Sequence, residues 1–548
     1  MHFKTWDDIA PPPNAAEQKL KAAAEAGEFC KLGPHDQIPE EPDDWSALTK
    51  AQEARHIRAE VLRLILLNSD GCDTTEEGVM MYGAYISGVL DLTNCTIPGN
   101  LLLDGCRFQN EIFAPRSKWA SNLRLRTCAL PALRAAGANI RGQLSCHGTI
   151  FDTPEGEAIY LQGAEVKEDL FLRSATFNGS ADLNGIRIGG QLTCTGAKFN
   201  TPKGKALDLQ RAEIKQSLTL ANATLNGPAN LTGIKIGGQL ACEGAKFNTP
   251  KGKALNLQTA EITGGLFLRN IAQIRGALDL HAAKTSTLVD DLHSYPPTGE
   301  LILDGFTYDR IIGPTDAKTR LDWLVKGDRW NGEFFPQPYK QLAKTLHHMG
   351  HESDAQQVLY TLATKLASER KKDMRRRLAD QRPYSPTLGL AIGLRLRLGA
   401  EHITDFLLRS TVGYGRKPFR SLGCLIGLIA LCWVFALGAW HRGDFAPNSA
   451  PILRSAEWRA LTDHPNAAQH WAQTSPTGRD WESFHPLAYA ADVVIPIVEF
   501  GQTDAWAPST ERGTWGYRLW WLRWVFTTAG WIVTALGAAA LTGIIRRD

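Results

Sequence analysis

The sequence predicts a mainly β protein, with a right-handed parallel β-helix, helical caps and two C-terminal transmembrane helices. Three observations predict this fold class. First, a 48-residue unit is repeated, reading IRIGGQLTCTGAKFNTPKGKALDLQ at Ile186–Gln210 and IKIGGQLACEGAKFNTPKGKALNLQ at Ile234–Gln258. Second, apolar residues within this unit recur with a period of 11 residues. Third, two long stretches near the C-terminus carry no charged side chain.

Within each 11-residue period, apolar residues occupy relative positions 0, 2, 5 and 7, as in Leu170, Leu172, Ala175 and Phe177. Period-two pairs are typical of short strands with one buried face, and the Gly and Asn residues between them indicate tight corners. Two such periods make one coil. A period that contains a TPxGxA insert is lengthened to 15 residues. The pattern over Val79–Tyr308 therefore predicts roughly nine coils stacked at the ~4.8 Å spacing of strands.

Helical segments are expected at both ends of the β-helix. Trp45–Asn68 has helical periodicity, and Tyr339–Leu359 reads as two helices joined by a turn at Gly350. The end coils of a solenoid expose unpaired strand edges that would otherwise associate with other chains. We therefore interpret both segments as caps.

The chain divides on these grounds into six parts. They are an N-terminal helical cap region at 1–75, the β-helix at 76–312, a helical cap and basic juxtamembrane region at 313–420, a first transmembrane helix at 421–441, an extracytoplasmic loop at 442–517 with a short apolar helix at 486–500, and a second transmembrane helix with a cytoplasmic tail at 518–548.

The two uncharged stretches are Ser421–Trp440 and Trp524–Ile545. Each matches the ~20 apolar residues that cross the hydrocarbon core of a bilayer. Residues 370–420 hold 13 Lys or Arg, whereas the loop 441–518 holds six Arg, no Lys and nine acids, and Arg546 and Arg547 follow the second stretch. The positive-inside rule therefore places both termini in the cytoplasm and the loop outside.

Two groups of cations are candidate binding residues. Basic residues beside a span are expected to contact anionic lipid head groups, and here they are Arg375, Arg376, Arg377, Arg416, Lys417 and Arg420. The TPKGKA inserts place a second group on one edge of the solenoid, which is a candidate edge for a protein partner: Lys203, Lys205, Lys251 and Lys253. The first repeat has Glu155 and Glu157 in place of these lysines. A row of solvated loops is the simpler interpretation of this edge.

The loop segment Pro486–Phe500 is apolar and short, which is typical of re-entrant or interfacial elements. As a re-entrant helix it would line a pore, with Asp492 and Glu499 forming acidic rings beside Pro496. As an interfacial helix it would lie on the outer leaflet, anchored by tryptophans such as Trp481 and Trp506. We favour the interfacial interpretation.

Candidate chemistry is sparse. The sequence has no GxGxxG after a strand, no CxxCH and no clustered cysteines, so we expect no cofactor. Cys146, Cys194 and Cys242 occupy inward repeat positions and read as core residues. His347 and His351 have metal-ligand spacing on a helix but lack a third ligand. We therefore predict no catalytic and no metal-binding residue, and whether the chain is an enzyme stays open.

Two stretches resemble a known repeat. Ala181-Asp-Leu-Asn-Gly185 and Ala229-Asn-Leu-Thr-Gly233 are similar to the A-(D/N)-L-x-x unit of pentapeptide-repeat proteins, although the steps here alternate between five and six residues. The order of IRAEVLR, the solenoid, QPYKQLAKTLHHMGHESDA, TVGYGRKPFR and HPLAYAADVVIPIVEFGQ resembles a bacterial membrane-anchored group. That resemblance implies a bacterial inner-membrane protein and the label membrane-associated oxidoreductase.

Three functions follow as hypotheses. We favour a membrane-anchored, non-catalytic scaffold whose cytoplasmic solenoid binds a protein partner. The alternative is a two-span pore regulated by the solenoid, and the third is the oxidoreductase that only the resemblance implies. The balance of 60 Lys and Arg against 57 Asp and Glu argues against a nucleic-acid partner. The expected partners are the lipid bilayer and an unidentified protein, and a homo-oligomer stays open.

Overall fold

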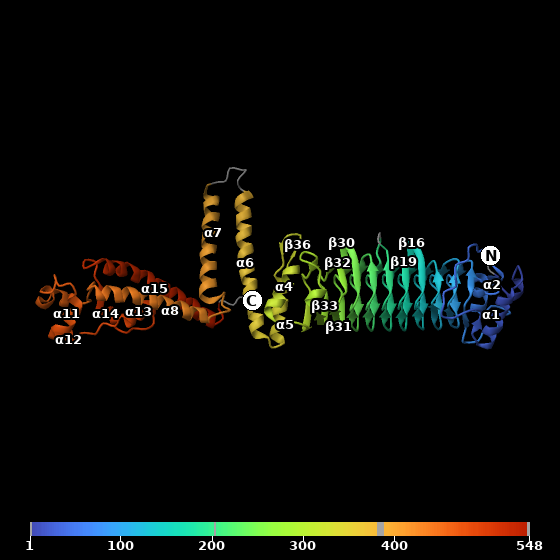
Figure 1. Ribbon diagram of the computed structural model, residues 1–548, viewed down its shortest axis with the longest axis horizontal. Coiled ribbons are helices and arrows are strands. Elements are labelled where there is room, and N and C mark those ends of the chain that lie inside the picture. Colours follow the sequence, from blue (N-terminus) through green and yellow to red (C-terminus); the bar gives the residue numbers. More distant parts are fainter. Residues whose placement is uncertain (1–2, 202–203, 381–387, 545–548) are drawn as a thin grey trace. The chain divides into compact units, whose positions relative to one another are not determined.

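The computed structural model describes residues 3–201, 204–380 and 388–544 (Figure 1). The chain forms two compact units, Met1–Val358 and Leu359–Asp548. The first contains the repeats and the second contains the two uncharged stretches.

The first unit is a parallel β-solenoid of about 10 turns, as the repeats predict. Its strands form one sheet of 19 strands and one of 16. Equivalent leucines stack in register from coil to coil, with Leu192 opposite Leu218 and Leu218 opposite Leu240. The longest strands are β16 (Ile150–Tyr160), β19 (Thr176–Asp182), β30 (Lys246–Asn256), β31 (Glu261–Leu268), β32 (Gln273–Asp279) and β33 (Lys284–Asp290).

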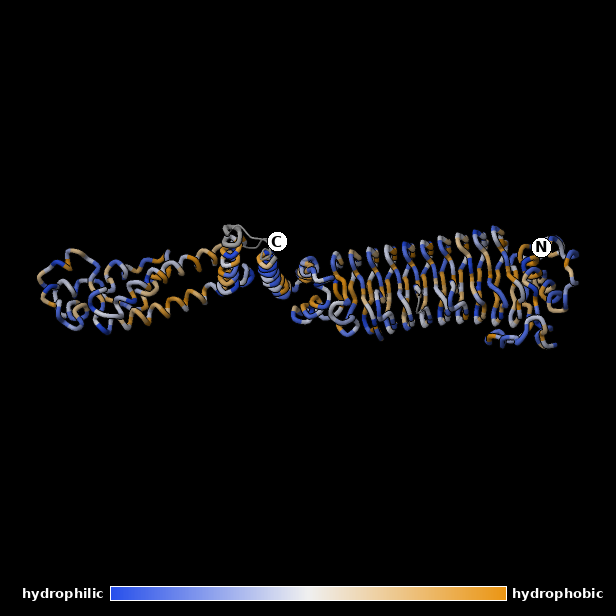
Figure 2. Tube along the Cα trace, turned by 90° about the horizontal axis from the view of Figure 1, so that it is seen from above, coloured by the Kyte–Doolittle hydropathy of each residue, from blue (hydrophilic) through white to orange (hydrophobic). Residues whose placement is uncertain are grey.

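The core of the solenoid is a stack of identical apolar positions, and hydropathy alternates along every coil (Figure 2). Phe151, Phe177 and Phe199 stack with ring centroids 5.0 and 4.9 Å apart. The repeat cysteines at 146, 194 and 242 are fully buried free thiols, and burial raises the pKa of each to about 12. They therefore act as core residues, because a protonated buried thiol is a poor nucleophile.

The N-terminal cap differs from the expected continuous helix over Trp45–Asn68. That segment holds α2 (Lys50–Glu53), the strand β2 (His56–Arg58) and α3 (Ala59–Leu66). The strand forms because β2 pairs in parallel with β4 (Tyr85–Ser87) and so adds to the sheet before the repeats begin. The helix that closes this end is α1 (Ala15–Ala26), which contacts β2 and α3.

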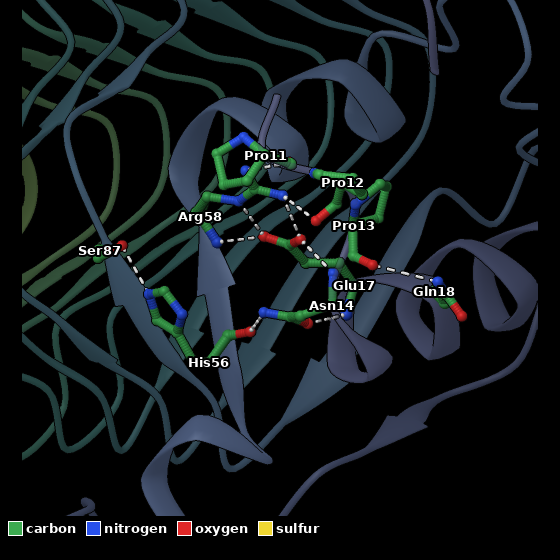
Figure 3. Close-up of polar contacts among 9 residues, drawn as sticks. All are labelled: Pro11, Pro12, Pro13, Asn14, Glu17, Gln18, His56, Arg58 and Ser87. Atoms are coloured by element: carbon green, nitrogen blue, oxygen red, sulfur yellow. Dashed lines mark hydrogen bonds and ion pairs between the residues drawn. The ribbon is translucent and has the colours of Figure 1, made fainter. Parts of the chain in front are cut away.

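Side chains at the start of α1 bind the free edge of β2 (Figure 3). The Asn14 amide donates to the His56 carbonyl over 3.0 Å, and the Arg58 backbone N–H donates to Glu17 Oε1 over 3.0 Å. The Arg58 guanidinium donates to both Glu17 carboxylate oxygens over 2.8 and 2.7 Å. Glu17 is fully buried, so this ion pair holds α1 on the first coil.

At the other end, α5 (Gln337–His348) closes the last coil. Its polar side chains bind backbone groups of β35 (Thr307–Ile312) and the turn before it. Gln341 Nε2 and Thr345 Oγ1 both donate to the Tyr308 carbonyl, over 2.6 and 2.9 Å. Gln337 accepts from Gly305 N–H over 2.9 Å and donates to the Phe306 carbonyl over 3.2 Å. The structure thus confirms a helical cap at this end.

A buried ion pair fastens α4 (Ala317–Gly327) to the same end. Arg320 Nη1 and Nη2 donate to the two Asp290 carboxylate oxygens, each over 2.7 Å, and both side chains are fully buried. Tyr295 adds a third hydrogen bond to Asp290 over 2.8 Å. Because the carboxylate is fully satisfied, the pair can remain charged inside the protein.

The second unit holds two helices long and apolar enough to span a membrane, α8 (Phe419–His441) and α15 (Thr514–Leu541). These bounds replace the expected 421–441 and the start of the 518–548 segment. The remaining elements are α6 (Glu352–Asp380), which begins in the first unit, α7 (Leu388–Leu407), the π-helical turn η3 (Leu408–Val412), β38 (Phe445–Pro447), α9 (Ala450–Arg454), α10 (Ala456–Arg459), α11 (Ala467–Thr474), α12 (Pro476–Arg479), α13 (Pro486–Val494), α14 (Gln502–Ala505) and β39 (Trp506–Pro508).

The buried ion pair of the N-terminal cap leads to a testable prediction. Glu17→Met removes the buried carboxylate that accepts from the Arg58 N–H and guanidinium, while the guanidinium keeps the Pro11 and Pro12 carbonyls. The lost charged hydrogen bonds should cost about 3 kcal/mol. Amide hydrogen exchange of β2 and β4 in the full-length protein should then be about 100-fold faster or more. Glu25→Met, on the same helix but in a half-exposed pair with Lys21, should change exchange by less than tenfold. Equal effects of the two variants would contradict this role of Glu17.

Candidate functional site

The lysines of the candidate partner edge differ in their surroundings: some pair with buried acids and one faces solvent. Lys205 Nζ pairs with Asp208 and Lys253 Nζ pairs with Asp279, each over 2.6 Å. Both acids are almost fully buried, so these two lysines neutralise the solenoid itself. Lys251 is exposed, and Lys203 lies outside the described residues. Of the described lysines on this edge, Lys251 is the one whose charge faces solvent without an ion pair.

The same edge is acidic in the first repeat. Glu157 pairs with Arg134 over 2.7 Å, and Arg134 also pairs with Glu111 over 2.7 Å. A groove of about 700 Å³ lies between this insert and the next, and Glu157, Asp182 and Asp208 line it. Burial raises the pKa of Asp182, and the neighbouring Asp208 and Glu157 add to the shift. The edge therefore gathers acids at the first groove and carries one solvent-facing lysine, Lys251, at the last insert.

Each insert lies directly against a glycine of the next coil. A Cβ on Gly227 would lie 2.4 Å from the Thr201 carbonyl oxygen, and one on Gly276 would lie 2.1 Å from that of Thr249. Both glycines have positive φ, 143° and 105°, a region that side chains disfavour. The first repeat has the same arrangement at Gly179. The inserts are therefore held against the sheet by close backbone packing.

The six lipid-contacting candidates form two separate groups. Arg375, Arg376 and Arg377 are exposed on α6. The other three lie between η3 and the first turn of α8, where Lys417 Nζ and the Arg420 guanidinium lie 4.9 and 5.8 Å from the Tyr360 ring. Along α6, Tyr360 and Arg375 are roughly 22 Å apart at 1.5 Å per residue. Arg416 is placed in the second group because it directly precedes Lys417 in the sequence.

The helix α13 lies between the two long apolar helices of the second unit. Its residues Tyr489, Ala490, Val493 and Val494 are buried in a core shared with α8 and α15. Thr527 Oγ1 of α15 donates to the Val493 carbonyl over 3.1 Å.

Gly530 allows this packing, because a Cβ there would lie 1.9 Å from the Val494 carbonyl oxygen. Gly530 is seven residues after Arg523 on α15, which is roughly 10 Å along the helix axis at 1.5 Å per residue. Small residues on α15 let the backbone of α13 pack against it. The interfacial location that we favoured for this helix stays a prediction.

Of the residues expected to line a pore, Asp492 has local hydrogen-bond partners. The Asp492 carboxylate accepts from Phe500 N–H over 2.8 Å and from Thr503 N–H and Oγ1 over 2.9 and 3.1 Å. The helix ends at Val494, two residues before Pro496, rather than at residue 500. Glu499 is exposed on the returning chain. Asp492 therefore fastens the turn after α13.

The expected tryptophan anchors also have internal partners. Trp506 is almost fully buried, and its indole N–H donates to the Glu482 carbonyl over 2.7 Å. Trp481 Nε1 donates to the Ala505 carbonyl over 3.1 Å. Both rings consequently stabilise the fold of the loop between α8 and α15.

No group of three or more His, Cys, Asp or Glu side chains is placed to hold a metal ion in residues 3–201, 204–380 and 388–544. His347 pairs with Glu352 at the exposed junction of α5 and α6. Comparison with known protein families, with characterised proteins and with solved structures finds no match to this chain. The likeness to pentapeptide-repeat proteins therefore rests on the solenoid architecture.

The close packing of the inserts leads to a second prediction. Gly227→Asn should destabilise the solenoid by about 1–3 kcal/mol, because the new Cβ meets a carbonyl at a strained φ. Gly185→Asn is the matched control, since Gly185 has φ 67° and open space around it, and Asn94 already occupies a corner with φ 56°. Thermal unfolding followed by circular dichroism should show a lower Tm for Gly227→Asn alone. A lower Tm for both variants would refute the packing argument.

The contacts of Asp492 lead to a third prediction. Asp492→Ala removes three hydrogen bonds from the turn after α13 and should cost about 1–3 kcal/mol locally. Limited proteolysis of the full-length protein in detergent should then cleave faster within residues 495–503. Asp504→Ala, which changes an exposed acid in the neighbouring α14, should leave the cleavage rate unchanged. Unchanged cleavage in Asp492→Ala would show that this carboxylate does not hold the turn.

Proposed function

We propose that the protein is a membrane-anchored scaffold, in which α8 and α15 hold the solenoid at a bilayer. The observation that carries this proposal is the outer surface of the two helices. Leu422, Ile426 and Leu431 of α8 and Val525 and Trp531 of α15 are all more than half exposed. Exposed apolar surface of this extent on paired helices is stable in lipid but not in water.

The inward sides of the same helices carry small residues. Ala436 and Ala439 of α8 are fully buried, and a Cβ on Gly537 of α15 would lie 2.8 Å from Ser421 Oγ. Small residues at contacts and large apolar residues outside are the arrangement expected of helices that associate within lipid. This pattern supports a membrane anchor over a soluble helical core.

We further propose that the solenoid lies on the cytoplasmic side of a bacterial inner membrane. The 13 Lys and Arg residues of 370–420 support this orientation, against six Arg and nine acids in the loop 441–518. Arg546 and Arg547, which would add to the bias, lie outside the described residues. The bacterial inner membrane itself is proposed from the resemblance alone.

The scaffold proposal rests on the regular surface of the solenoid. Repeated coils present the same side chains at fixed spacing, which suits recognition of an extended protein partner. The insert edge is the candidate surface, because acids gather at its first groove and Lys251 projects from its last insert. We do not extend the proposal to a pore, since Asp492 is bonded within its own turn.

Site-specific photo-cross-linking in cells tests the proposed edge. A photoreactive amino acid at Lys251 should give one discrete protein adduct in the carbonate-washed membrane fraction. The matched control places the same group at Lys235, which is exposed on β28 (Lys235–Ile236) of the other sheet and should give no adduct. Recovery of the protein in the soluble fraction would overturn the anchor, and equal adducts at both positions would overturn the edge.

A further inference from the structure

The helix α7 has an exposed apolar face that the two-span anchor does not explain. Leu396, Ile403 and Phe406 are 69%, 63% and 69% exposed. They fall on one side of the helix, because seven and three residues correspond to about two turns and one turn. An exposed row of large apolar side chains marks a surface that contacts another apolar phase.

The opposite side of α7 is polar and packs on α6. Asp405 pairs with Lys371 over 2.5 Å, and Glu401 pairs with Arg370 over 3.6 Å. Asp405 is nine residues from Leu396, roughly two and a half turns, and so lies on the other side of the helix. The apolar face therefore points away from α6.

The orientation of α7 within the second unit suits a membrane surface. It lies crosswise to α8 and α15, and it is on the side of α6 toward which these helices extend (Figures 1 and 2). The turn η3 joins it to α8 and contacts both α8 and α15. This joint is fixed by hydrogen bonds from Tyr414 N–H to the Leu408 carbonyl over 3.0 Å and from Lys417 N–H to the Val412 carbonyl over 3.1 Å. If α8 and α15 cross a bilayer, α7 runs along its plane.

The charges around the apolar face match an anionic lipid surface. Arg395 and Arg397 are exposed and lie one residue to either side of Leu396, so they flank the face. Arg409 is exposed beyond its other end, before the cations that precede α8. Long arginine side chains at such positions keep their apolar stems in lipid and their guanidinium groups at head groups.

We propose that α7 lies in the plane of the membrane interface, with Leu396, Ile403 and Phe406 in the acyl region and Arg395 and Arg397 on anionic head groups. This inference deepens the proposed function and rests on it, because it requires that α8 and α15 span the bilayer. The apolar face of α7 is covered by lipid rather than by a second copy of the chain. The flanking arginines favour this choice, since the same pairs of cations on two facing copies would repel each other.

Collision-rate measurements on spin labels test the inference in the full-length protein. Single cysteines at Ile403 and Phe406 are labelled in a background of Cys95→Ala and Cys424→Ala, because the remaining cysteines are buried. Leu431→Cys on the exposed side of α8 is the lipid control, and Lys235→Cys, which is exposed on β28 of the solenoid, is the water control. The protein is reconstituted in vesicles of phosphatidylethanolamine and phosphatidylglycerol and in vesicles of phosphatidylcholine alone.

Labels at Ile403 and Phe406 should collide with oxygen in preference to a water-soluble nickel chelate, with a ratio several-fold above that at Lys235. Arg395→Glu with Arg397→Glu should lower this ratio in the phosphatidylglycerol vesicles and leave Leu431 unchanged. Wild-type protein in phosphatidylcholine should show the same decrease.

The contrary outcomes are distinct from one another. Water exposure at Leu431 would overturn the membrane anchor, and with it this inference. A lipid-exposed Leu431 beside water-exposed Ile403 and Phe406 would overturn the inference alone. Labels at Ile403 and Phe406 shielded from both collision partners until the protein is diluted into excess lipid would identify a second copy as the occupant, which also overturns it.

Discussion

The free backbone groups at the two ends of the solenoid are the constraint on which the first unit depends. Every inner coil satisfies its N–H and C=O groups through the coils above and below, but a terminal coil has one unpaired side. In this chain, side chains of a helix take the place of the missing coil. Asn14 and Glu17 bind β2 at one end, and Gln341 and Thr345 bind the Tyr308 carbonyl at the other.

An ion pair between an arginine and a buried carboxylate accompanies each cap, Glu17 with Arg58 and Asp290 with Arg320. Such a pair adds little net stability over apolar residues, but removal of one partner leaves a buried charge unpaired. Its value here is geometric, because a bidentate pair fixes the helix in one position on the coil. The caps therefore specify where the solenoid ends as well as protecting its edges.

The solenoid could be predicted from the sequence because its repeat imposes the same local environment many times. The caps could be predicted only as helical segments, since β2 forms through pairing with β4 and three residues carry no strand signal of their own. The spacing of Gln337, Gln341 and Thr345 at every fourth residue was a signal that hydrophobic periodicity does not detect. In the segment between α8 and α15, the charge of Asp492 suited the hypothesis of a pore. Its hydrogen bonds could not be predicted, because they depend on a turn that the sequence does not reveal.

The same physical rule connects the solenoid with the helical unit. Where a backbone carbonyl must approach another element, the chain has a glycine: Gly227 faces Thr201, and Gly530 faces Val494. In the solenoid this approach holds an insert on the sheet, and between α8 and α15 it admits a short helix whose last carbonyls then need partners. Thr527 supplies one of them from α15. The helix α13 ends at Val494 after nine residues, and there the Asp492 carboxylate accepts from the N–H groups of Phe500 and Thr503, which turns the chain back.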